Sequence, residues 1–319
     1  MTFRVLTEEE IRRLLPMSEC IELMADALTA LARHEIHNPL RFVVRPPDAD
    51  TLMGLMPAHR AKPEPLYALK AICIVPANPS RGLDAHQGSV TLCDGETGQV
   101  RAIMNASAIT EIRTAAVSGV ATRLLARPGS RAVAILGAGV QARSHLEAMR
   151  HVLDVDSVRV WSRTPGRAAA VGDVEEAASA EDAVRGADVV CTVTSSREPV
   201  LRRDWLKAGA HVNAVGASVP TARELDSQTI ADAALFVDRR ESTINEAGDY
   251  LVPLHEGAIA PDHIRGELGE LLLGTVAGRR SDDELTVFKS LGLAVEDLAA
   301  AEHVLRRAEA EDVGTVVEF

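Results

Sequence analysis

The chain has 319 residues, of which 46 % are hydrophobic and 25 % are charged, and its formal net charge is −12. This length allows two domains with substantial cores. The negative charge argues against nucleic acid and anionic lipid as partners, since both would repel the protein. No apolar run reaches transmembrane length, and the N-terminal residues lack the apolar core of a signal peptide. We therefore expect no membrane partner and a cytoplasmic location.

The cysteines favour the same compartment. They lie in apolar contexts without any Cys-x-x-Cys pair, as small core residues in a reducing environment do, at Cys20, Cys73, Cys93 and Cys191. The run from His34 to His37 does not match the His-Glu-x-x-His zinc motif. The sequence therefore predicts no metal site.

Residues up to about 103 predict a mixed α+β region. Thr7 to Glu10 form a capping box that starts a short helix, and a second helix follows from about Ser18 to His34. Short segments separated by Pro- and Gly-rich turns then predict an antiparallel sheet, with strands at 40–45, 51–56, 67–75, 89–93 and 100–104. A helix of small residues, 106–126, leads out of this region.

Three cations in this region are candidates for binding a carboxylate. Only four of the 34 basic residues are lysines, and one of them, Lys70, lies inside an apolar strand segment. Arg45 and Arg113 lie on or beside the predicted strands and the helix. Each cation alone could extend its charged end to solvent along an apolar surface. Together they predict a pocket for a substrate carboxylate.

The segment around residue 137 predicts a dinucleotide site. A buried strand at 132–136 is followed by Gly137-Ala138-Gly139-Val140-Gln141-Ala142, a helix, and a second strand at 158–161. Gly137 allows the tight turn, Gly139 lets the backbone approach a pyrophosphate, and Ala142 is small enough for close helix–strand packing. The alternative is a tight turn with no ligand, but the βαβ spacing favours a cofactor.

The residues after the second strand predict which cofactor binds. Enzymes that prefer NAD place Asp or Glu there to hold the ribose 2′-hydroxyl. This chain has Ser162-Arg163-Thr164 instead, which can bind a 2′-phosphate through charge-assisted hydrogen bonds. NADP(H) is therefore favoured over NAD(H), with a solvated loop arginine as the alternative reading of Arg163.

Further buried strands at 187–194, 211–216 and 234–238 predict a doubly wound parallel sheet. Ligands of such sheets bind beyond the carboxyl ends of the strands. Two segments are therefore expected to line the nicotinamide half of the cofactor, Thr192-Val193-Thr194 and Val215-Gly216-Ala217, with Glu224-Leu225-Asp226 just beyond. The last part, Leu285 to Arg307, is predicted as a helix that is apolar on one face.

These motifs occur together and in this order in the ornithine cyclodeaminase/mu-crystallin family, and the chain most closely resembles the ketimine-reductase branch of that family. The resemblance extends to Met56-Pro57, His86-Gln87, Glu246 to Asp249 and Val287 to Gly292. It implies an α/β fold in which a Rossmann NADP(H)-binding domain, residues 120–289, is inserted in an α+β dimerisation and substrate domain, residues 1–119 and 290–319. It also implies a homodimer.

The resemblance implies roles for individual residues. Arg45, Lys70 and Arg113 clamp the substrate carboxylate, and Asp226 is the acid/base near the reacting nitrogen. Cofactor contacts are expected from further residues in the matched segments, namely Arg113, Thr114 and Ser290.

Two positions depart from the cyclodeaminase branch. That branch carries a glutamate two residues before its Met-Pro and a carboxylate after its second Rossmann strand, where this chain has Gly54 and Ser162. Both departures favour NADPH-linked reduction over ornithine cyclisation.

The predicted reaction is hydride transfer from NADPH to the carbon of a C=N bond next to a carboxylate, as in a cyclic ketimine, to give an L-amino acid. One alternative is an amino-acid dehydrogenase or an ornithine/lysine-type cyclodeaminase, which acts on an amino acid instead. Another is a crystallin-like protein that binds NADPH with little turnover, against which the acid/base Asp226 argues. The sequence does not identify the side chain of the substrate.

Overall fold

The computed structural model describes residues 2–318, and the chain divides into two compact units. Unit 1 comprises residues 1–113 and 293–319, and unit 2 comprises residues 114–292. Helix α3 (Ala106–Leu125) begins in unit 1 and continues into unit 2.

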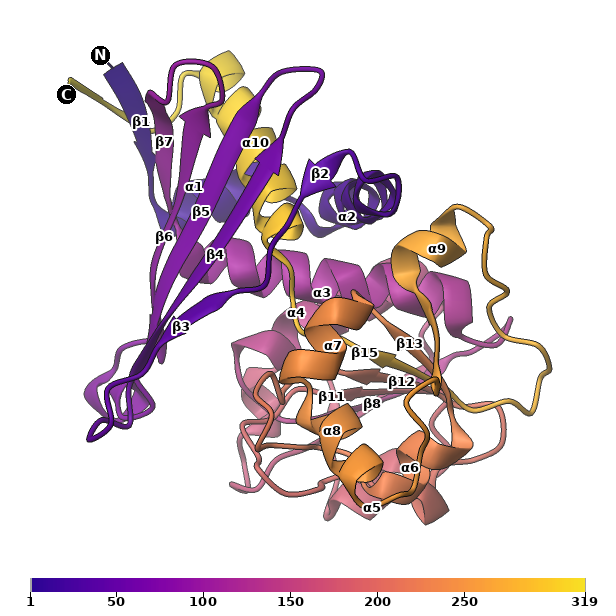
Figure 1. Ribbon diagram of the computed structural model, residues 1–319. Helices are drawn as coiled ribbons and strands as arrows, with labels where there is room; N and C mark the ends of the chain where they lie inside the picture. The colour runs from indigo at the N-terminus through magenta and orange to yellow at the C-terminus, as the bar shows by residue number, and fades with distance from the viewer. Residues whose placement is uncertain (1, 319) are drawn as a thin grey trace. The chain divides into compact units, whose positions relative to one another are not determined.

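Unit 1 is built on one sheet, which we call sheet A (Figure 1). Its strands lie in the order β16-β1-β7-β6-β5-β4-β2, and β3 also pairs with β4. The β1–β7 pair is parallel and the other pairs are antiparallel. The strands are β1 (Thr2–Leu6), β2 (Ile36–His37), β3 (Phe42–Val44), β4 (Leu52–Arg60), β5 (Leu66–Ile74), β6 (His86–Asp94), β7 (Val100–Asn105) and β16 (Thr315–Glu318).

Besides the start of α3, the described residues of unit 1 form the helices α1 (Glu8–Leu14), α2 (Met17–Ala32) and α10 (Ala294–Glu311). The predicted capping box starts α1, because the Thr7 side chain accepts from the Glu10 backbone while the Glu10 side chain accepts from the Thr7 N–H. Helix α10 packs against α2 and against β4, β5 and β6. It therefore covers the face of sheet A toward which alternate residues of β5, such as Ala68 and Lys70, are buried.

Unit 2 contains a fully parallel sheet, which we call sheet B, in the order β10-β9-β8-β11-β12-β15-β13-β14. Its strands are β8 (Ala132–Leu136), β9 (Ser157–Trp161), β10 (Glu175–Glu176), β11 (Val189–Thr192), β12 (His211–Ala214), β13 (Ala234–Val237), β14 (Ile264–Glu267) and β15 (Thr286–Lys289). The central strands are buried along their whole length, as parallel strands between two helical layers are. The predicted doubly wound α/β fold is confirmed.

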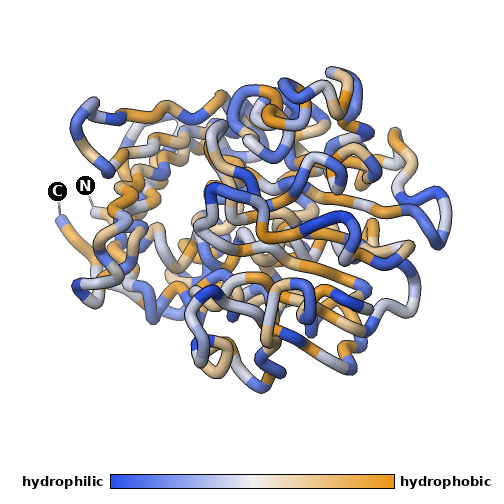
Figure 2. The backbone as a smooth tube through the Cα atoms, turned by 90° about the horizontal axis from the view of Figure 1, so that it is seen from below, coloured by the Kyte–Doolittle hydropathy of each residue, from blue (hydrophilic) through white to orange (hydrophobic). Residues whose placement is uncertain are grey.

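The helices of unit 2 are α4 (Val140–Val152), α5 (Ala180–Val184), α6 (Ser227–Asp232), α7 (Arg240–Glu246), α8 (Gly248–His255) and α9 (Leu268–Leu272). Short 3₁₀ turns lie at Asn78–Arg81 in unit 1 and at Ala168–Ala170 and Arg203–Trp205 in unit 2. Figure 2 shows hydrophobic and hydrophilic residues interspersed along the backbone, with several outlying turns hydrophilic. Within residues 2–318, no helix is long and apolar enough to span a bilayer.

The sequence prediction for residues 285–307 is wrong in its first part. Thr286 to Lys289 form β15, a buried strand between β12 and β13, and α10 begins only at Ala294. Gly292, at a φ of +76°, lies between the two elements. Apolar residues in a short buried strand fit a helical pattern equally well, so periodicity alone did not separate the two elements.

Candidate functional site

Lys70 lies in the interior of unit 1. Its side chain is 2 % exposed on the covered face of sheet A, where β5 places it opposite Met56 of β4 and Val90 of β6. Both neighbours are apolar, so the ammonium depends on helix residues for its polar partners. Thr110 on α3 provides one of these, with an Oγ1 that lies 3.4 Å from Lys70 Nζ.

Two carboxylates in the first turn of α10 neutralise Lys70 and Arg113. Lys70 Nζ lies 3.0 Å from Asp297 Oδ1 and 2.8 Å from Asp297 Oδ2. Arg113 donates from Nε to Asp297 Oδ1 over 3.0 Å and from Nη1 to Glu296 Oε2 over 2.6 Å. All four side chains are at most 4 % exposed. Asp297 thus bridges two of the three cations that the sequence predicted to bind a carboxylate.

The environment of Lys70 changes its proton affinity. Burial lowers the pKa of Lys70 to about 8, and the positive charges of Arg113 and Arg41 act in the same direction while Asp297 opposes them. Burial, together with the charge of Lys70, also lowers the pKa of His86. The Lys70 ammonium can therefore exchange a proton close to neutral pH, which an exposed lysine cannot do.

Arg41, which the sequence analysis did not select, lies closer to this group than the predicted Arg45. β3 pairs Phe42 with Leu55 of β4. Continuing this register by one residue places Arg41 opposite Met56, and Met56 pairs with Lys70 of β5. Arg45 lies four residues further along and is exposed. Arg41 and Arg45 lie on either side of β3 and, being four residues apart, are expected on the same face of the sheet. Only the strand register shows which of them lies opposite Met56.

The two carboxylates of α10 were also missed by the sequence analysis. Acidic residues are common in the first turn of any helix, because they interact favourably with the positive end of the helix dipole. Their partners come from segments far away in the sequence, so nothing local distinguishes Glu296 and Asp297. Asn38 fixes this end of the helix, since its Oδ1 accepts the Val295 N–H over 2.8 Å.

In unit 2 the glycine loop has the geometry that a pyrophosphate requires. Gly137 has a φ of +120°, and a Cβ there would lie 2.7 Å from the carbonyl oxygen of Val193. A Cβ on Gly139 would meet no heavy atom within 4 Å, so space is open in front of the helix end. Gly139 is the N-cap of α4, and it has no side chain that could accept hydrogen bonds from the N–H groups of the first turn. An anion bound at this helix end can accept them instead. These residues fit a dinucleotide cofactor.

The segment predicted to select the cofactor lies at the same edge of sheet B. β8 and β9 are parallel and pair Leu136 with Trp161, and the Gly137 N–H donates to the Trp161 carbonyl over 2.8 Å. Ser162 follows directly and is half-buried, whereas Arg163 and Thr164 are exposed.

The strand ends predicted to line the nicotinamide half converge on one carboxylate, that of Glu224. Thr192 and Thr194 donate to it through their hydroxyls, over 2.8 and 2.7 Å. The backbone N–H groups of Thr194 and Gly216 do so over 2.6 Å each. Glu224 stands two residues before the predicted acid/base, and the sequence analysis assigned it no role. No sequence signal marked it as buried.

Asp226 caps a helix, a role that the sequence analysis did not assign to it. It is the N-cap of α6, and its Oδ1 accepts from the backbone N–H of Thr229 over 2.9 Å and from the Thr229 hydroxyl. Its Oδ2 accepts from the Arg203 N–H over 3.3 Å. An acid/base role for Asp226 stays a prediction, and it requires the carboxylate to exchange these partners.

The remaining residues that were predicted to contact the cofactor lie just after strands of sheet B or on α3. Ser290 follows β15 and is buried, and its N–H donates to the Ala214 carbonyl over 3.0 Å. Val215 and Ala217 follow β12, and the Val215 N–H donates to the Thr192 carbonyl over 3.0 Å. Thr114, on α3, is 8 % exposed.

A parallel sheet with a Gly-x-Gly-x-x-Ala loop after its first strand defines a protein of the Rossmann dinucleotide-binding class. The chain belongs to the ornithine cyclodeaminase/mu-crystallin family, whose model matches residues 1–312.

Individual relatives are similar over most of the chain. The ketimine reductase mu-crystallin of Mus musculus is 43 % identical over 274 residues, 84 % of either chain. A solved Delta(1)-pyrroline-2-carboxylate reductase of Thermococcus litoralis, in complex with NADH and L-proline, is 34 % identical with a TM-score of 0.95 and covers 98 % of this chain and 99 % of its own. An archaeal alanine dehydrogenase dimer with bound NAD is 32 % identical with a TM-score of 0.94, and all of both chains is covered.

Proposed function

We propose that this protein is an NADPH-dependent reductase that converts a cyclic ketimine, with its C=N bond next to a carboxylate, into an L-amino acid. The observation that carries the proposal is the buried pair of cations, Lys70 and Arg113, in a chain that also has a dinucleotide loop. The similarity to a ketimine reductase and to a pyrroline-2-carboxylate reductase supports the same substrate class.

The charge of the group in unit 1 suits a substrate carboxylate. Lys70 and Arg113 are balanced by Glu296 and Asp297, and Arg41 adds a third positive charge that acts on Lys70. The positive charges of Arg41 and Arg113, which both act on Lys70, favour the approach of an anion. A carboxylate bound among these cations forms charge-assisted hydrogen bonds in a desolvated environment, which fixes its orientation.

Lys70 is also the chain's own candidate for handling the proton. When bound, the cofactor supplies a hydride, which adds to the imine carbon as the C=N bond becomes CH–NH. The nitrogen must then carry a proton, and the Lys70 ammonium, with its pKa lowered to about 8, can donate one. Asp297 stabilises the charged form of Lys70 before the transfer. Asp226 is the competing candidate for this role.

Cofactor preference is part of the proposal. The half-buried Ser162 and the exposed Arg163 and Thr164 offer hydroxyls and a guanidinium to a 2′-phosphate, and no carboxylate stands among them to bind a free 2′-hydroxyl. The solved relatives named above carry NADH and NAD, so the preference needs a direct measurement.

A second candidate function is oxidation of an amino acid. The likeness to an alanine dehydrogenase favours it, and the same cations would bind the amino-acid carboxylate. This direction needs Lys70 as a neutral base, so it is expected at higher pH than the reduction.

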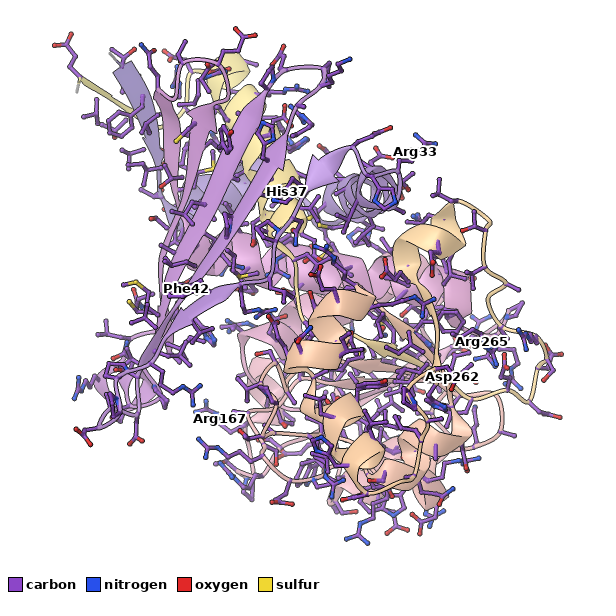
Figure 3. All side chains as sticks on the ribbon, in the orientation of Figure 1. Arg33, His37, Phe42, Arg167, Asp262 and Arg265 are labelled. Atoms are coloured by element: carbon purple, nitrogen blue, oxygen red, sulfur yellow. The ribbon has the colours of Figure 1, made fainter. Side chains whose placement is uncertain are left out.

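We also propose that the protein is a homodimer formed through sheet A. The face of this sheet opposite α10 carries exposed apolar side chains, among them Met53, Tyr67 and Leu69, and β3 adds Phe42, which Figure 3 labels. A second copy of the chain would cover them.

The function is tested by following reduced-cofactor absorbance with five- and six-membered cyclic ketimines that carry a 2-carboxylate, and with linear 2-imino acids. L-amino acids with either oxidised cofactor test the reverse direction. We expect the fastest turnover with a cyclic ketimine and NADPH. An enzyme that turns over only amino acids would support the second candidate, and binding of NADPH without any turnover would support the binding-protein alternative.

A further inference from the structure

The carboxylate of Glu224 joins two loops of unit 2 that are far apart in sequence. Its Oε1 accepts the N–H and the hydroxyl of Thr194, and its Oε2 accepts the hydroxyl of Thr192 and the N–H of Gly216. These four donors lie at or just after the carboxyl ends of β11 and β12, and Glu224 is fully buried. One side chain therefore links the two strand ends.

The segments after β11 and β12 are in close contact at Gly216, where a side chain would not fit. A Cβ on Gly216 would lie 2.0 Å from the Thr194 carbonyl oxygen and 2.6 Å from Glu224 Oε1. On the other side, Val193 donates its N–H to the Leu136 carbonyl over 2.9 Å and stands next to Gly137. The loops held by Glu224 thus adjoin the loop that fits a pyrophosphate.

Further buried groups hold Glu224 itself. Asp249 of α8 accepts the N–H groups of Glu224 and Leu225 through Oδ1, over 2.8 and 3.0 Å. Asp249 Oδ2 lies 3.0 Å from Lys289 Nζ, and Lys289 of β15 donates to the Ala214 carbonyl over 3.2 Å. Asp249 and Lys289 are each 1 % exposed. Glu224 is therefore anchored by residues of α8 and β15, outside its own loop.

We propose that Glu224 is the positioning residue of the cofactor site: its ionised carboxylate holds the loops after β11 and β12 in the conformation that binds the cofactor, and its protonation weakens that binding. The inference rests on the proposed dinucleotide site in unit 2. In this role Glu224 acts through Thr192, Thr194 and Gly216.

The ionised form suits this set of partners, because two of them are backbone N–H groups that can only donate and the two threonine hydroxyls can donate as well. A protonated carboxyl would donate its own O–H to one of the hydroxyls, and that hydroxyl would then need another buried acceptor for its proton. The charged groups that face Glu224 are Asp249 and Lys289. Burial and the negative charge of Asp249 raise the pKa of Glu224, whereas Lys289 and the hydrogen bonds from Thr194 lower it. Protonation therefore occurs at a higher pH than for an exposed glutamate.

The test is NADPH binding, measured by fluorescence titration between pH 5 and 8 for the wild type, Glu224→Gln and Glu267→Gln. Glu267 is a matched control, because burial raises its pKa too and its Oε1 accepts the Arg240 N–H over 2.8 Å, but it lies at β14. The cofactor's 2′-phosphate also titrates in this pH range, and it affects every variant equally. Each variant is therefore compared with the wild type at the same pH. We expect Glu224→Gln to bind at least fivefold more weakly at pH 7.5 and to lose part of the acid dependence, while Glu267→Gln follows the wild type.

The possible outcomes separate the inference from the proposed function. If the wild type binds neither NADPH nor NADH, the proposed function fails as well. If Glu224→Gln binds like the wild type at every pH, only the positioning role is overturned. Should Glu224→Gln not fold, Thr194→Val replaces it, because this change removes one hydroxyl donor and keeps the N–H donor. We expect three- to tenfold weaker binding for Thr194→Val, and unchanged binding would overturn the inference.

Discussion

The ammonium of Lys70 lies 2.8 Å from a carboxylate oxygen of Asp297, and neither side chain is more than 2 % exposed. Removing one partner of such a buried pair typically costs about 3–5 kcal/mol, because a buried charge is left uncompensated. Asp297 also receives a hydrogen bond from Arg113 over 3.0 Å, so the cost of losing Lys70 is expected at the lower end of that range. Any test of Lys70 must therefore separate stability from activity.

Lys70→Met is expected to lower kcat/KM for the imine by about tenfold to a few hundredfold, or ~1.5–3 kcal/mol, because one charge-assisted hydrogen bond to the substrate carboxylate is lost. NADPH affinity should not change. The control is Lys70→Met combined with Asp297→Asn, which removes both charges. The double variant should regain thermal stability without regaining activity. If both variants keep wild-type turnover on every accepted imine, the assignment of Lys70 to the substrate is wrong.

The pH profile tests the state of Lys70. Because its pKa is lowered to about 8, kcat/KM for reduction should fall as pH rises through that value and the ammonium is lost. The free energy of unfolding should change in the opposite direction and increase with pH. Between pH 8 and the ordinary lysine pKa of about 10.4, the unfolded chain binds a proton that the folded chain does not, so this group adds stability as pH rises.

Lys70→Arg is the control for that profile. Arginine stays charged throughout this range, so any residual activity of the variant should lack the alkaline limb. Steady-state rates between pH 6 and 10 measure both proteins. An unchanged alkaline limb in Lys70→Arg would assign the titration to another group.

The sequence predicted the parts of the site that depend on local pattern. The glycine loop of Gly137 and Gly139 was predicted because strand, turn and helix are contiguous there. The choice between Arg41 and Arg45 could not be made, since it depends on the pairing of β3 with β4. Glu224 was passed over because three of its four donors belong to Thr192 and Thr194, which lie on and after a different strand. Burial of a carboxylate is a tertiary property that composition does not reveal.

The edges of the fold were hard to predict for the same reason. Strands β1 and β16 lie at the two ends of the chain, and each is completed by the other through antiparallel pairing, for example of Phe3 with Val317. Neither segment alone has an alternation strong enough to predict a strand. The α10 helix was predicted with an early start because β15, just before it, is uniformly buried.

Arg163→Ala is expected to weaken NADPH binding by roughly 1.5–3 kcal/mol, the range for a hydrogen bond to a charged group. NADH lacks the 2′-phosphate, so its binding should be nearly unchanged and serves as the internal control. Titration of both reduced cofactors with wild type and variant measures the effect. Equal or tighter binding of NADH by the wild type would contradict the proposed preference.

Leu69→Glu is expected to convert the dimer to a monomer in sedimentation velocity at micromolar concentration. The side chain is 40 % exposed on the uncovered face of sheet A, and a carboxylate there would be buried without a partner in the dimer. Ile244→Glu is the matched control, since Ile244 is an exposed apolar residue, at 48 %, on α7 of unit 2. A wild type that sediments as a monomer, or a Leu69→Glu protein that stays dimeric, would contradict the proposed interface.

Asp226→Asn distinguishes the two candidates for the proton. Asparagine caps a helix about as well as aspartate, so α6 should persist and the melting temperature should change little. If Lys70 supplies the proton, kcat/KM should stay within about threefold of the wild type, because the change affects only the helix cap and the contact with the Arg203 N–H. If Asp226 is the acid/base, kcat should fall by about 10²-fold or more, the usual contribution of a positioned general acid or base. In that case the fall of kcat/KM at high pH would reflect only the loss of substrate binding by Lys70. Titration of Lys70 would then change KM and leave kcat unchanged.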